Sequence, residues 1–323
     1  MKRLAVAATF VGAIVGAGFA SGREIALYFS GTSVLTPLLS GALLGLFCFL
    51  FLEIGRATGG RPTRLSKKLS LPLNLIIRLE NAVTYFAMIA GAEEIVYFLF
   101  SFSGGGIVSG ILVLGLVVMG ADKVKWSNLI IVPAIVILVA VLFFKNAVPP
   151  KTGVFSPLSA FSYCTMNIMG GGYLVSGYSG DFSKKDSIVT ASVAGVVVTG
   201  LLYAVYCVVN VSPESAMPLL AAAEEVGLST VAEIVAYLAV FSTLTGSLSI
   251  ASANKPSFAA VITAASFVVA TLGFRNLVDK AYPVLGAIGA VVSISYVFLY
   301  ARYQYRKKEK RPASIGPCEA TRL

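Results

Sequence analysis

The sequence predicts an all-α membrane protein with ten transmembrane helices in a 5+5 inverted repeat, of which helices one and six are broken. Composition is the first reason, because the 323-residue chain is 57% apolar and only 12% charged, with a mean hydropathy of +0.86. A soluble domain carries roughly 25% charged residues, so this chain cannot cover a surface that faces water. The other two reasons are ten apolar segments of spanning or nearly spanning length and two glycine-rich segments that open the two halves.

The ten apolar segments follow one another with short polar connections. Residues 105–120 and 258–272 are short and need flanking residues to cross a hydrocarbon core of about 30 Å. The others are expected at 4–29, 34–55, 75–102, 129–144, 158–178, 188–209, 231–251 and 278–300. Residues 1–150 are then the first five-helix repeat, 151–302 the second, and 303–323 a basic cytoplasmic tail.

Basic residues are distributed unevenly between the two sets of loops. The loops after segments two, four, six and eight, together with the tail, carry most of them, and they fall on the same side as Lys2 and Arg3. The opposite loops carry only Lys145, Lys151, Arg275 and Lys280. This asymmetry predicts a multi-pass protein of the cell membrane with both termini in the cytoplasm. Membrane topology thus accounts for the net charge of +10, and no nucleic-acid partner is expected.

Residues that commonly carry catalysis or bind metals are scarce. The chain has no histidine, and its four cysteines lack the spacing of a disulfide framework or a zinc site. We therefore expect no enzyme and no cofactor, with a bound Na⁺ as the one possible ion.

The spacing of the segments predicts an internal repeat. Segments two, three and four begin near residues 34, 75 and 105, and segments seven, eight and nine begin about 153 residues later. The glycine cluster VGAIVGAGFASGRE, residues 11–24, has its counterpart in NIMGGGYLVSG, residues 167–177. Because five is odd, the second unit enters the membrane from the opposite side, which is typical of secondary transporters.

The two glycine clusters predict broken helices. A break exposes backbone groups that each cost several kcal/mol in lipid unless they face a cavity, an ion or a ligand. The alternative is that the glycines only let helices pack closely. At a break, the half-helix N-terminus favours an anionic group and the free carbonyls favour a cation. A substrate with a carboxylate, together with a sodium ion, fits both ends.

These features resemble the LeuT fold of the amino acid–polyamine–organocation superfamily over residues 4–300. The stretch VGAIVGAGFASGRE also resembles the opening of the YkvI-like family of bacterial membrane proteins. In the sodium-coupled members of the superfamily, carbonyls of the first break and hydroxyls of the eighth helix hold the ion. The resemblance implies that Gly12 and Val15 offer carbonyls here.

The stretch FSTLTGSLS, residues 241–249, resembles the sodium-binding pattern of the eighth helix. Thr245 matches its threonine and Ser242 would offer a carbonyl. Gly246 replaces the following serine, so Ser247 or Thr243 would have to substitute for it. Interhelical hydrogen bonding is the alternative role of these hydroxyls.

Substrate contacts are expected at the two breaks and from nearby aromatic rings. Packing within the bundle is the alternative role of the rings. The candidate substrate-binding residues are Gly16, Ala17, Gly18, Tyr85, Phe161, Tyr163, Gly170, Gly171 and Gly172.

The resemblance implies an outer gate in which Arg23 pairs with Asp279. A local pair of Arg23 with Glu24, or a pair of Glu24 with Lys280, is the competing arrangement. Unpaired charge in the membrane costs at least about 2.5–3.5 kcal/mol, so some pairing is expected.

Four other glutamates lie in or beside predicted helices. Glu93 and Glu94 lie well inside segment three and could bind a proton, a cation or a substrate ammonium. Neighbouring helical residues point about 100° apart, so at most one of them faces the cavity, and contact with the outer headgroups is the alternative. Glu53 is expected to pair with Arg56 at the cytoplasmic end of its helix. Glu80 is expected at the inner interface.

The sequence therefore predicts a secondary active transporter of a small zwitterionic solute, an amino acid, that works by alternating access coupled to sodium or protons. The alternative is a ligand-sensing membrane protein that uses a transporter scaffold without net transport.

Overall fold

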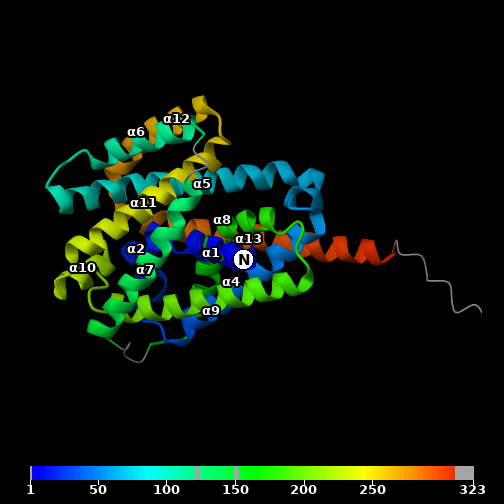
Figure 1. The fold of residues 1–323 in the computed structure, drawn as a ribbon, viewed down its shortest axis with the longest axis horizontal. Coiled ribbons are helices and arrows are strands. Elements are labelled where there is room, and N and C mark those ends of the chain that lie inside the picture. The colour runs from blue at the N-terminus through cyan, green and yellow to red at the C-terminus, as the bar shows by residue number, and fades with distance from the viewer. Residues whose placement is uncertain (1, 121–123, 149–152, 310–323) are drawn as a thin grey trace, which may run out of the picture.

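The structure is a computed structural model that describes residues 2–120, 124–148 and 153–309. Lys151 and residues 310–323 of the predicted tail lie outside the described residues. The described chain is helical almost throughout, as Figure 1 shows. Its helices are α1 (Lys2–Ile14), α2 (Ala17–Ser21), α3 (Arg23–Phe29), α4 (Leu35–Thr58), α5 (Lys67–Phe100), α6 (Gly105–Val118), α7 (Val124–Asn146), α8 (Pro157–Tyr178), α9 (Lys184–Val209), α10 (Pro218–Glu225), α11 (Ser229–Ser252), α12 (Pro256–Val269) and α13 (Phe274–Glu309), with short 3₁₀ turns at Pro62–Leu65 and Ala270–Leu272.

Each predicted apolar segment corresponds to one of these helices, except that the first is divided among α1, α2 and α3. In the described residues, five helices are long and apolar enough to cross a membrane: α4, α9, α11 and most of α5 and α13. Shorter apolar helices cover Gly105–Val118, Ile131–Asn146 and Pro256–Leu272. Large apolar side chains such as Leu46, Val196 and Phe298 lie exposed on the outside of the bundle. A multi-pass membrane protein presents such a surface to lipid.

The first segment is interrupted, as its glycines predict. The helix ends at Ile14, and α2 begins at Ala17 after an extended residue, Gly16. A second interruption follows at Gly22, whose φ of 77° is left-handed and favours glycine. Two bends in the same segment thus separate three helical pieces, and the backbone between them faces the interior of the bundle.

The predicted break in helix six is wrong, because α8 runs without interruption from Pro157 to Tyr178. Two glycines of its cluster, Gly171 and Gly172, serve close packing instead. A Cβ atom on Gly172 would lie 2.7 Å from the Phe51 ring of α4, and one on Gly171 would touch Phe10 and Ile14 of α1. Glycine here brings two helices together, which was the alternative role of this cluster.

Helices that the predicted repeat would make equivalent lie side by side. The pairs α4 with α9, α5 with α11, α6 with α12, and α1 with α8 are in contact, and Figure 1 shows α6 beside α12 at the top of the view. In the pair α4–α9, Gly41 faces Thr199 and Gly45 faces Gly195. Residue numbers rise on one helix as they fall on the other, so this pair is antiparallel.

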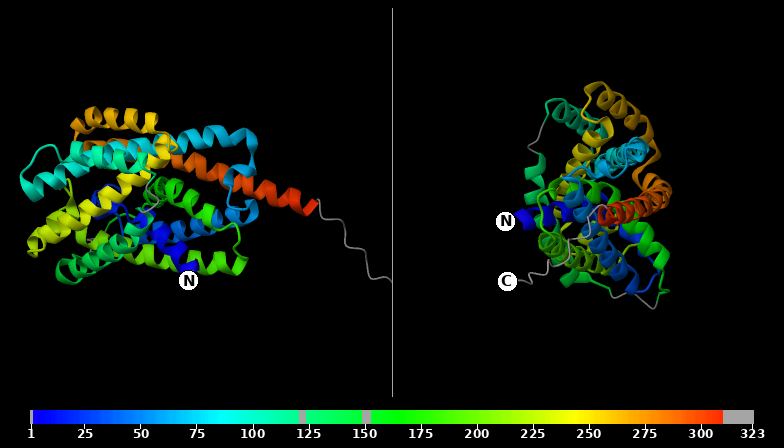
Figure 2. Two further views of the ribbon diagram at one scale, coloured as in Figure 1. Left: turned by 45° about the horizontal axis from the view of Figure 1, so that its top comes forward. Right: turned by 90° about the vertical axis from the view of Figure 1, so that its right-hand side faces the viewer.

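The last helix is longer than predicted. α13 continues to Glu309, so residues 303–309 of the predicted tail prolong the helix. The left view of Figure 2 shows this end of α13 extending beyond the other helices.

Candidate functional site

A cavity of about 190 Å³ lies at the break of the first segment. Its walls come from α1, α2, α3, α5, α8, α11 and α13, so both halves of the chain contribute to it. The cavity is many times larger than the space that one buried water needs, about 10–15 Å³ on the same scale. The size therefore suits a small molecule or an ion rather than a polymer.

The Glu24 carboxyl group lies in this cavity. Glu24 is the second residue of α3, and its side chain is almost fully enclosed, with 7% of the residue exposed. The carboxyl group lies directly against Gly18 of α2, where an added Cβ atom would be only 1.6 Å from Oε1. Oε2 is buried and has no hydrogen-bond partner among the residues that the structure describes. The sequence suggested Glu24 only as a partner for Arg23 or Lys280, and neither pair forms among the described residues.

Glu80 supplies a second carboxyl group to the cavity, from α5. Its exposed fraction is 9%, and Asn81 Nδ2 donates to its Oε2 at 3.3 Å. Glu80 was expected at the inner interface near Arg78, and the structure places it in the buried wall of the cavity. The Arg78 guanidinium donates to the Ala251 carbonyl at 2.9 Å and lies over the Phe258 ring.

The sequence does contain a signal for the face of α5 that carries Glu80, namely polar and cavity-lining residues at a spacing of four. Glu80, Thr84 and Met88 are four residues apart and all line the cavity, which is the pattern of one helix face. Reading this face from the sequence would have required knowing that it points inward, and the apolar flanks of α5 do not show that.

The rest of the cavity wall mixes polar and apolar side chains, and it carries no basic side chain among the described lining residues. Asn81 and Asn167 each use their amide nitrogen to donate to a carbonyl of their own helix, at 2.8 and 3.1 Å. The hydroxyl-bearing residues on the wall are Thr9, Thr84, Ser242, Thr243, Ser247 and Tyr282. Two carboxyl groups without a compensating cation favour an occupant that brings positive charge.

The predicted substrate-binding residues fall into three groups. Gly16, Gly18, Gly170 and Gly171 line the cavity. Ala17 is the first residue of α2, and its side chain lies outside what the structure describes. The described lining does not include the other four, Gly172, Tyr85, Phe161 and Tyr163.

The three aromatic candidates pack between helices instead. Tyr85 on α5 makes a 3.2 Å hydrogen bond with Thr263 of α12. Tyr163 lies between Tyr28 and Phe29, with ring centroids 5.6 and 5.1 Å away. Phe161 packs against the apolar core. Their role in packing was the alternative that the sequence left open.

Only some of the five predicted sodium ligands line the same cavity. Gly12, Ser242 and Ser247 line the cavity, whereas Val15 and Thr245 do not belong to its described lining. The Thr245 hydroxyl donates to the Phe241 carbonyl at 2.9 Å, within its own helix. The described residues contain no group of three or more Asp, Glu, Cys or His that could hold a metal ion. A sodium site made of these five residues remains a prediction.

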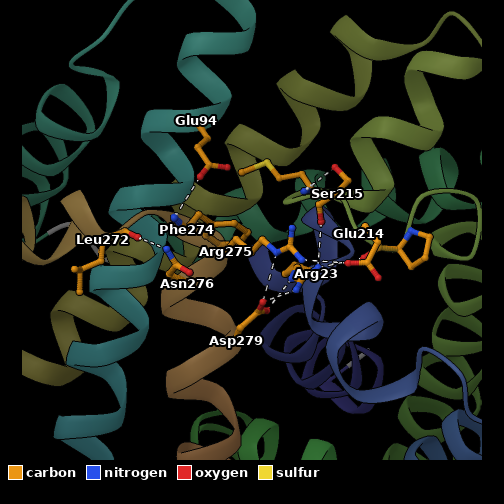
Figure 3. Close-up of polar contacts among 11 residues, drawn as sticks. Arg23, Glu94, Glu214, Ser215, Leu272, Phe274, Arg275, Asn276 and Asp279 are labelled. Carbon is orange, nitrogen blue, oxygen red and sulfur yellow. Dashed lines mark hydrogen bonds and ion pairs between the residues drawn. The ribbon is translucent and has the colours of Figure 1, made fainter.

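Arg23 and Asp279 form a bidentate ion pair beside the cavity (Figure 3). Arg23 Nε donates to Oδ1 at 2.8 Å and Nη2 to Oδ2 at 2.5 Å. Nη1 donates to the carbonyls of Pro213 and Ser215, each at 3.2 Å. The guanidinium therefore connects α3 to α13 and to the segment before α10. Its role as a gate stays a prediction.

Glu93 and Glu94 cap helices and do not belong to the described cavity lining. Glu93 accepts hydrogen bonds from the backbone N–H groups of Gly104 and Gly106, both at 2.7 Å, where α6 begins. Glu94 accepts from the N–H of Phe274 at 3.3 Å, at the start of α13 (Figure 3). Helix N-termini favour carboxylates because their first N–H groups lack partners within the helix. The sequence allowed at most one of the two to face the cavity; the structure shows both as caps, and their role in coupling stays a prediction.

Ion pairs also join α1 to the connection between α8 and α9 and to the first turn of α9. The Lys2 ammonium contacts Asp181 at 2.5 Å and lies over the Phe182 ring, and Arg3 pairs with Asp186. The Lys2 ammonium lowers the pKa of Asp181 below its ordinary value. As predicted, Glu53 and Arg56 form a bidentate pair at the end of α4, with distances of 2.8 and 2.5 Å.

The fold resembles that of solved transporters at low sequence identity. Over 92% of this chain and 74% of the other, it matches Mhp1, a nucleobase-cation-symport-1 family transporter, in a closed conformation with bromovinylhydantoin bound, at a TM-score of 0.53 and 14% identity. Over 95% of this chain and 73% of the other, it matches the Eremococcus coleocola manganese transporter mutant H236A at a TM-score of 0.50 and 16% identity. Identities this low show a shared fold alone.

No family model matches the chain, and no curated protein sequence matches it. The resemblance to the YkvI-like family therefore stays a prediction.

Proposed function

We propose that this protein is a secondary active transporter that carries a small zwitterionic solute of the amino-acid class across the cell membrane, and that it is not an enzyme. The observation that carries the proposal is the cavity at the break of the first segment, where Glu24 and Glu80 lie without a basic side chain among the described lining residues. A carboxylate in such a site recognises an ammonium group through charge-assisted hydrogen bonds.

Glu80 is the carboxylate that anchors the ammonium group in this proposal. Asn81 and Thr84 on the same helix and Asn167 on α8 surround the space in front of it. These amides and hydroxyls offer hydrogen bonds to the remaining polar atoms of a small zwitterion. The volume of about 190 Å³ favours the smaller amino acids.

Alternating access requires two halves that can move around the site, and the pairing of helices supports this arrangement. We infer ten transmembrane helices in a 5+5 inverted repeat, with both termini in the cytoplasm. The contacts of α4 with α9, α5 with α11 and α6 with α12 support it, because an inverted repeat places equivalent helices about one axis. The fold shared with Mhp1 and the manganese transporter also supports transport.

In this arrangement Arg23 and Asp279 form the outer gate. The gate opens when α3 separates from α13, which breaks the bidentate pair and the contacts of Arg23 with Pro213 and Ser215. Separating a buried ion pair leaves each charge without its partner, which costs several kcal/mol. Water must therefore reach Arg23 as the gate opens.

The test is binding and uptake by the purified protein. Radiolabelled L-amino acids are offered singly to protein reconstituted in proteoliposomes, with an imposed sodium or pH gradient. We expect one or more small amino acids to accumulate. Glu80→Gln should weaken their binding about tenfold to a hundredfold, because a hydrogen bond to a charged group contributes about 1.5–3 kcal/mol.

The matched control is Glu225→Gln, which changes an exposed carboxylate on α10 and should leave binding and uptake at wild-type levels. Binding without accumulation would favour the ligand-sensing alternative. Absence of both binding and uptake for every amino acid would contradict the proposed solute class.

A further inference from the structure

We propose that the Glu24 carboxyl group carries the coupling proton of this transporter, while Glu80 anchors the solute. The inference rests on the proposed transport function and names its coupling ion. It assigns different tasks to two carboxyl groups of the same cavity, and their surroundings differ in the way those tasks require.

The surroundings of Glu24 favour a neutral carboxylic acid over a carboxylate. The residue is 7% exposed, and Oε2 has no hydrogen-bond partner among the described residues. A buried charge without a partner costs several kcal/mol, and a group in this situation takes up a proton instead. Glu80 differs, because Asn81 donates to its Oε2.

The elements packed around Glu24 present no positive charge to it among the described residues. Tyr28 on α3, Tyr163 on α8 and Tyr282 on α13 lie near its carboxyl group, and Glu80 on α5 shares the cavity. On α9, the Tyr206 hydroxyl donates to the Thr32 carbonyl. α2 has no titratable side chain, and the glutamates of α10 are exposed. Phenol groups and a second carboxyl group cannot replace a proton as the source of positive charge.

The nearest arginine in sequence is already engaged. Arg23 precedes Glu24 directly, but its guanidinium binds Asp279 and the carbonyls of Pro213 and Ser215. Arg23 therefore belongs to the gate and Glu24 to the cavity, although both stand at the start of one seven-residue helix, α3.

This position lets the proton act on the gate. α3 begins after the left-handed residue Gly22 and carries the gate arginine and the cavity carboxyl group next to each other. When the cavity faces outward, a proton from the outer aqueous phase binds a Glu24 carboxylate oxygen and makes the group neutral. The neutral group can then be buried against Gly18 as α3 closes. When the cavity faces inward, water reaches the group and the proton leaves to the cytoplasm.

The first experiment detects the proton on Glu24 directly and needs no substrate. Infrared difference spectra of the purified protein between about pH 5 and pH 9 resolve the C=O stretch of a protonated carboxyl group, which a carboxylate lacks. We expect a band in the wild type that disappears as the pH rises and is missing from Glu24→Gln. It should persist in Glu225→Gln. An unchanged band in Glu24→Gln would overturn the proposal, whether or not any amino acid is transported.

The second experiment separates coupling from binding. With the amino acid that the wild type transports, Glu24→Gln in proteoliposomes should still exchange labelled for unlabelled solute across the membrane. It should lose accumulation driven by a pH gradient in sodium-free buffer. Glu24→Asp, which keeps a titratable group, should recover part of that accumulation and shows that the position tolerates substitution. Accumulation by Glu24→Gln equal to the wild type, or wild-type accumulation that follows only the sodium gradient, would overturn the proposal.

Discussion

At the scale of the residue, the site depends on one steric fit. The Glu24 carboxyl group occupies the space that a side chain on residue 18 would need, since an added Cβ atom would lie 1.6 Å from Oε1 and 2.1 Å from Cδ. Gly18 thus allows a carboxyl group to lie against the backbone of the broken segment. The glycines of this segment serve two purposes, because Gly22 provides a left-handed bend and Gly18 provides room.

Replacing Gly18 tests this fit. We expect Gly18→Ala to fold, because Glu24 can rotate away, but to reduce proton-driven uptake about tenfold or more, because the carboxyl group leaves its place by more than an ångström. Gly170→Ala is the matched control, since Gly170 also lines the cavity but has no atom within 4 Å of its added Cβ. Uptake assays and thermal unfolding of both variants check the prediction. Wild-type uptake by Gly18→Ala would contradict the placement of Glu24.

At the scale of the element, helix ends explain where intramembrane carboxylates go. Glu93 and Glu94 are adjacent in α5, yet one caps α6 and the other caps α13. Glu93 accepts from two backbone N–H groups and Glu94 from one, and an unsatisfied group in lipid costs several kcal/mol. A carboxylate inside a hydrophobic segment is therefore not in itself a sign of a substrate site.

The cap of α6 should matter for stability and not for transport. Glu93→Ala removes the acceptor of two hydrogen bonds of 2.7 Å, and we expect a loss of about 1–3 kcal/mol in the free energy of unfolding. The loss should appear as a lower midpoint in thermal unfolding in detergent, while uptake per folded molecule stays at the wild-type level. Uptake lost with unchanged stability would instead indicate a role in coupling. Glu225→Ala, at an exposed site, serves as the control.

The attachment of α1 should depend on pH through Asp181. The Lys2 ammonium lowers the pKa of this exposed carboxyl group, so the pair stabilises the attachment fully above the ordinary pKa of about 4. The stabilisation is lost as the pH falls through the lowered value, because the protonated acid no longer attracts Lys2. We expect hydrogen–deuterium exchange in α1, corrected for its intrinsic pH dependence, to rise a few-fold on acidification.

In Asp181→Asn, hydrogen–deuterium exchange in α1 should already be raised at neutral pH. Acidification should then cause no further increase through this pair. High salt should act in the same direction on the wild type, since the pair is exposed and is screened by ions. Exchange in α1 that is identical in the wild type and Asp181→Asn at neutral pH would show that the pair does not hold α1.

At the scale of the whole molecule, close helix contacts join the two halves of the chain. α4 and α9 approach each other at Gly41 and Gly45, where an added Cβ atom on Gly41 would lie 2.7 Å from the Thr199 Cα atom. Within the second half, an added Cβ atom on Gly289 of α13 would lie 2.2 Å from the Thr165 carbonyl oxygen of α8. In a bilayer, such contacts hold helices together through van der Waals packing.

A substitution at the α4–α9 contact should separate the halves. Gly41→Ala collides with backbone atoms of the other helix and should destabilise the fold by about 1–3 kcal/mol. Gly200→Ala on α9 meets no atom within 4 Å and should be neutral or slightly stabilising, because alanine favours a helix by about 1 kcal/mol over glycine. Thermal unfolding of the two variants distinguishes them. Equal stability would show that α4 and α9 do not pack as closely as described.

Much of the architecture follows from the sequence alone, because hydropathy, segment length and glycine content are local properties of the chain. The helices α4, α9, α11 and α12 lie within a few residues of their expected positions, and the break of the first segment follows from its glycines. The pair of Arg23 with Asp279 was expected from a resemblance between folds and not from the residues themselves.

The tertiary structure decided which carboxyl groups face the cavity and which glycines break a helix. Glu93 and Glu94 find their partners in α6 and α13, whereas Glu24 and Glu80 meet in the cavity from α3 and α5. The rotation of each helix about its axis, and the neighbour that its face meets, set these environments. The GGG cluster of α8 remains helical because Phe10 and Phe51 fill the space beside it. A glycine permits both a break and a close contact, and the neighbouring helix decides between them.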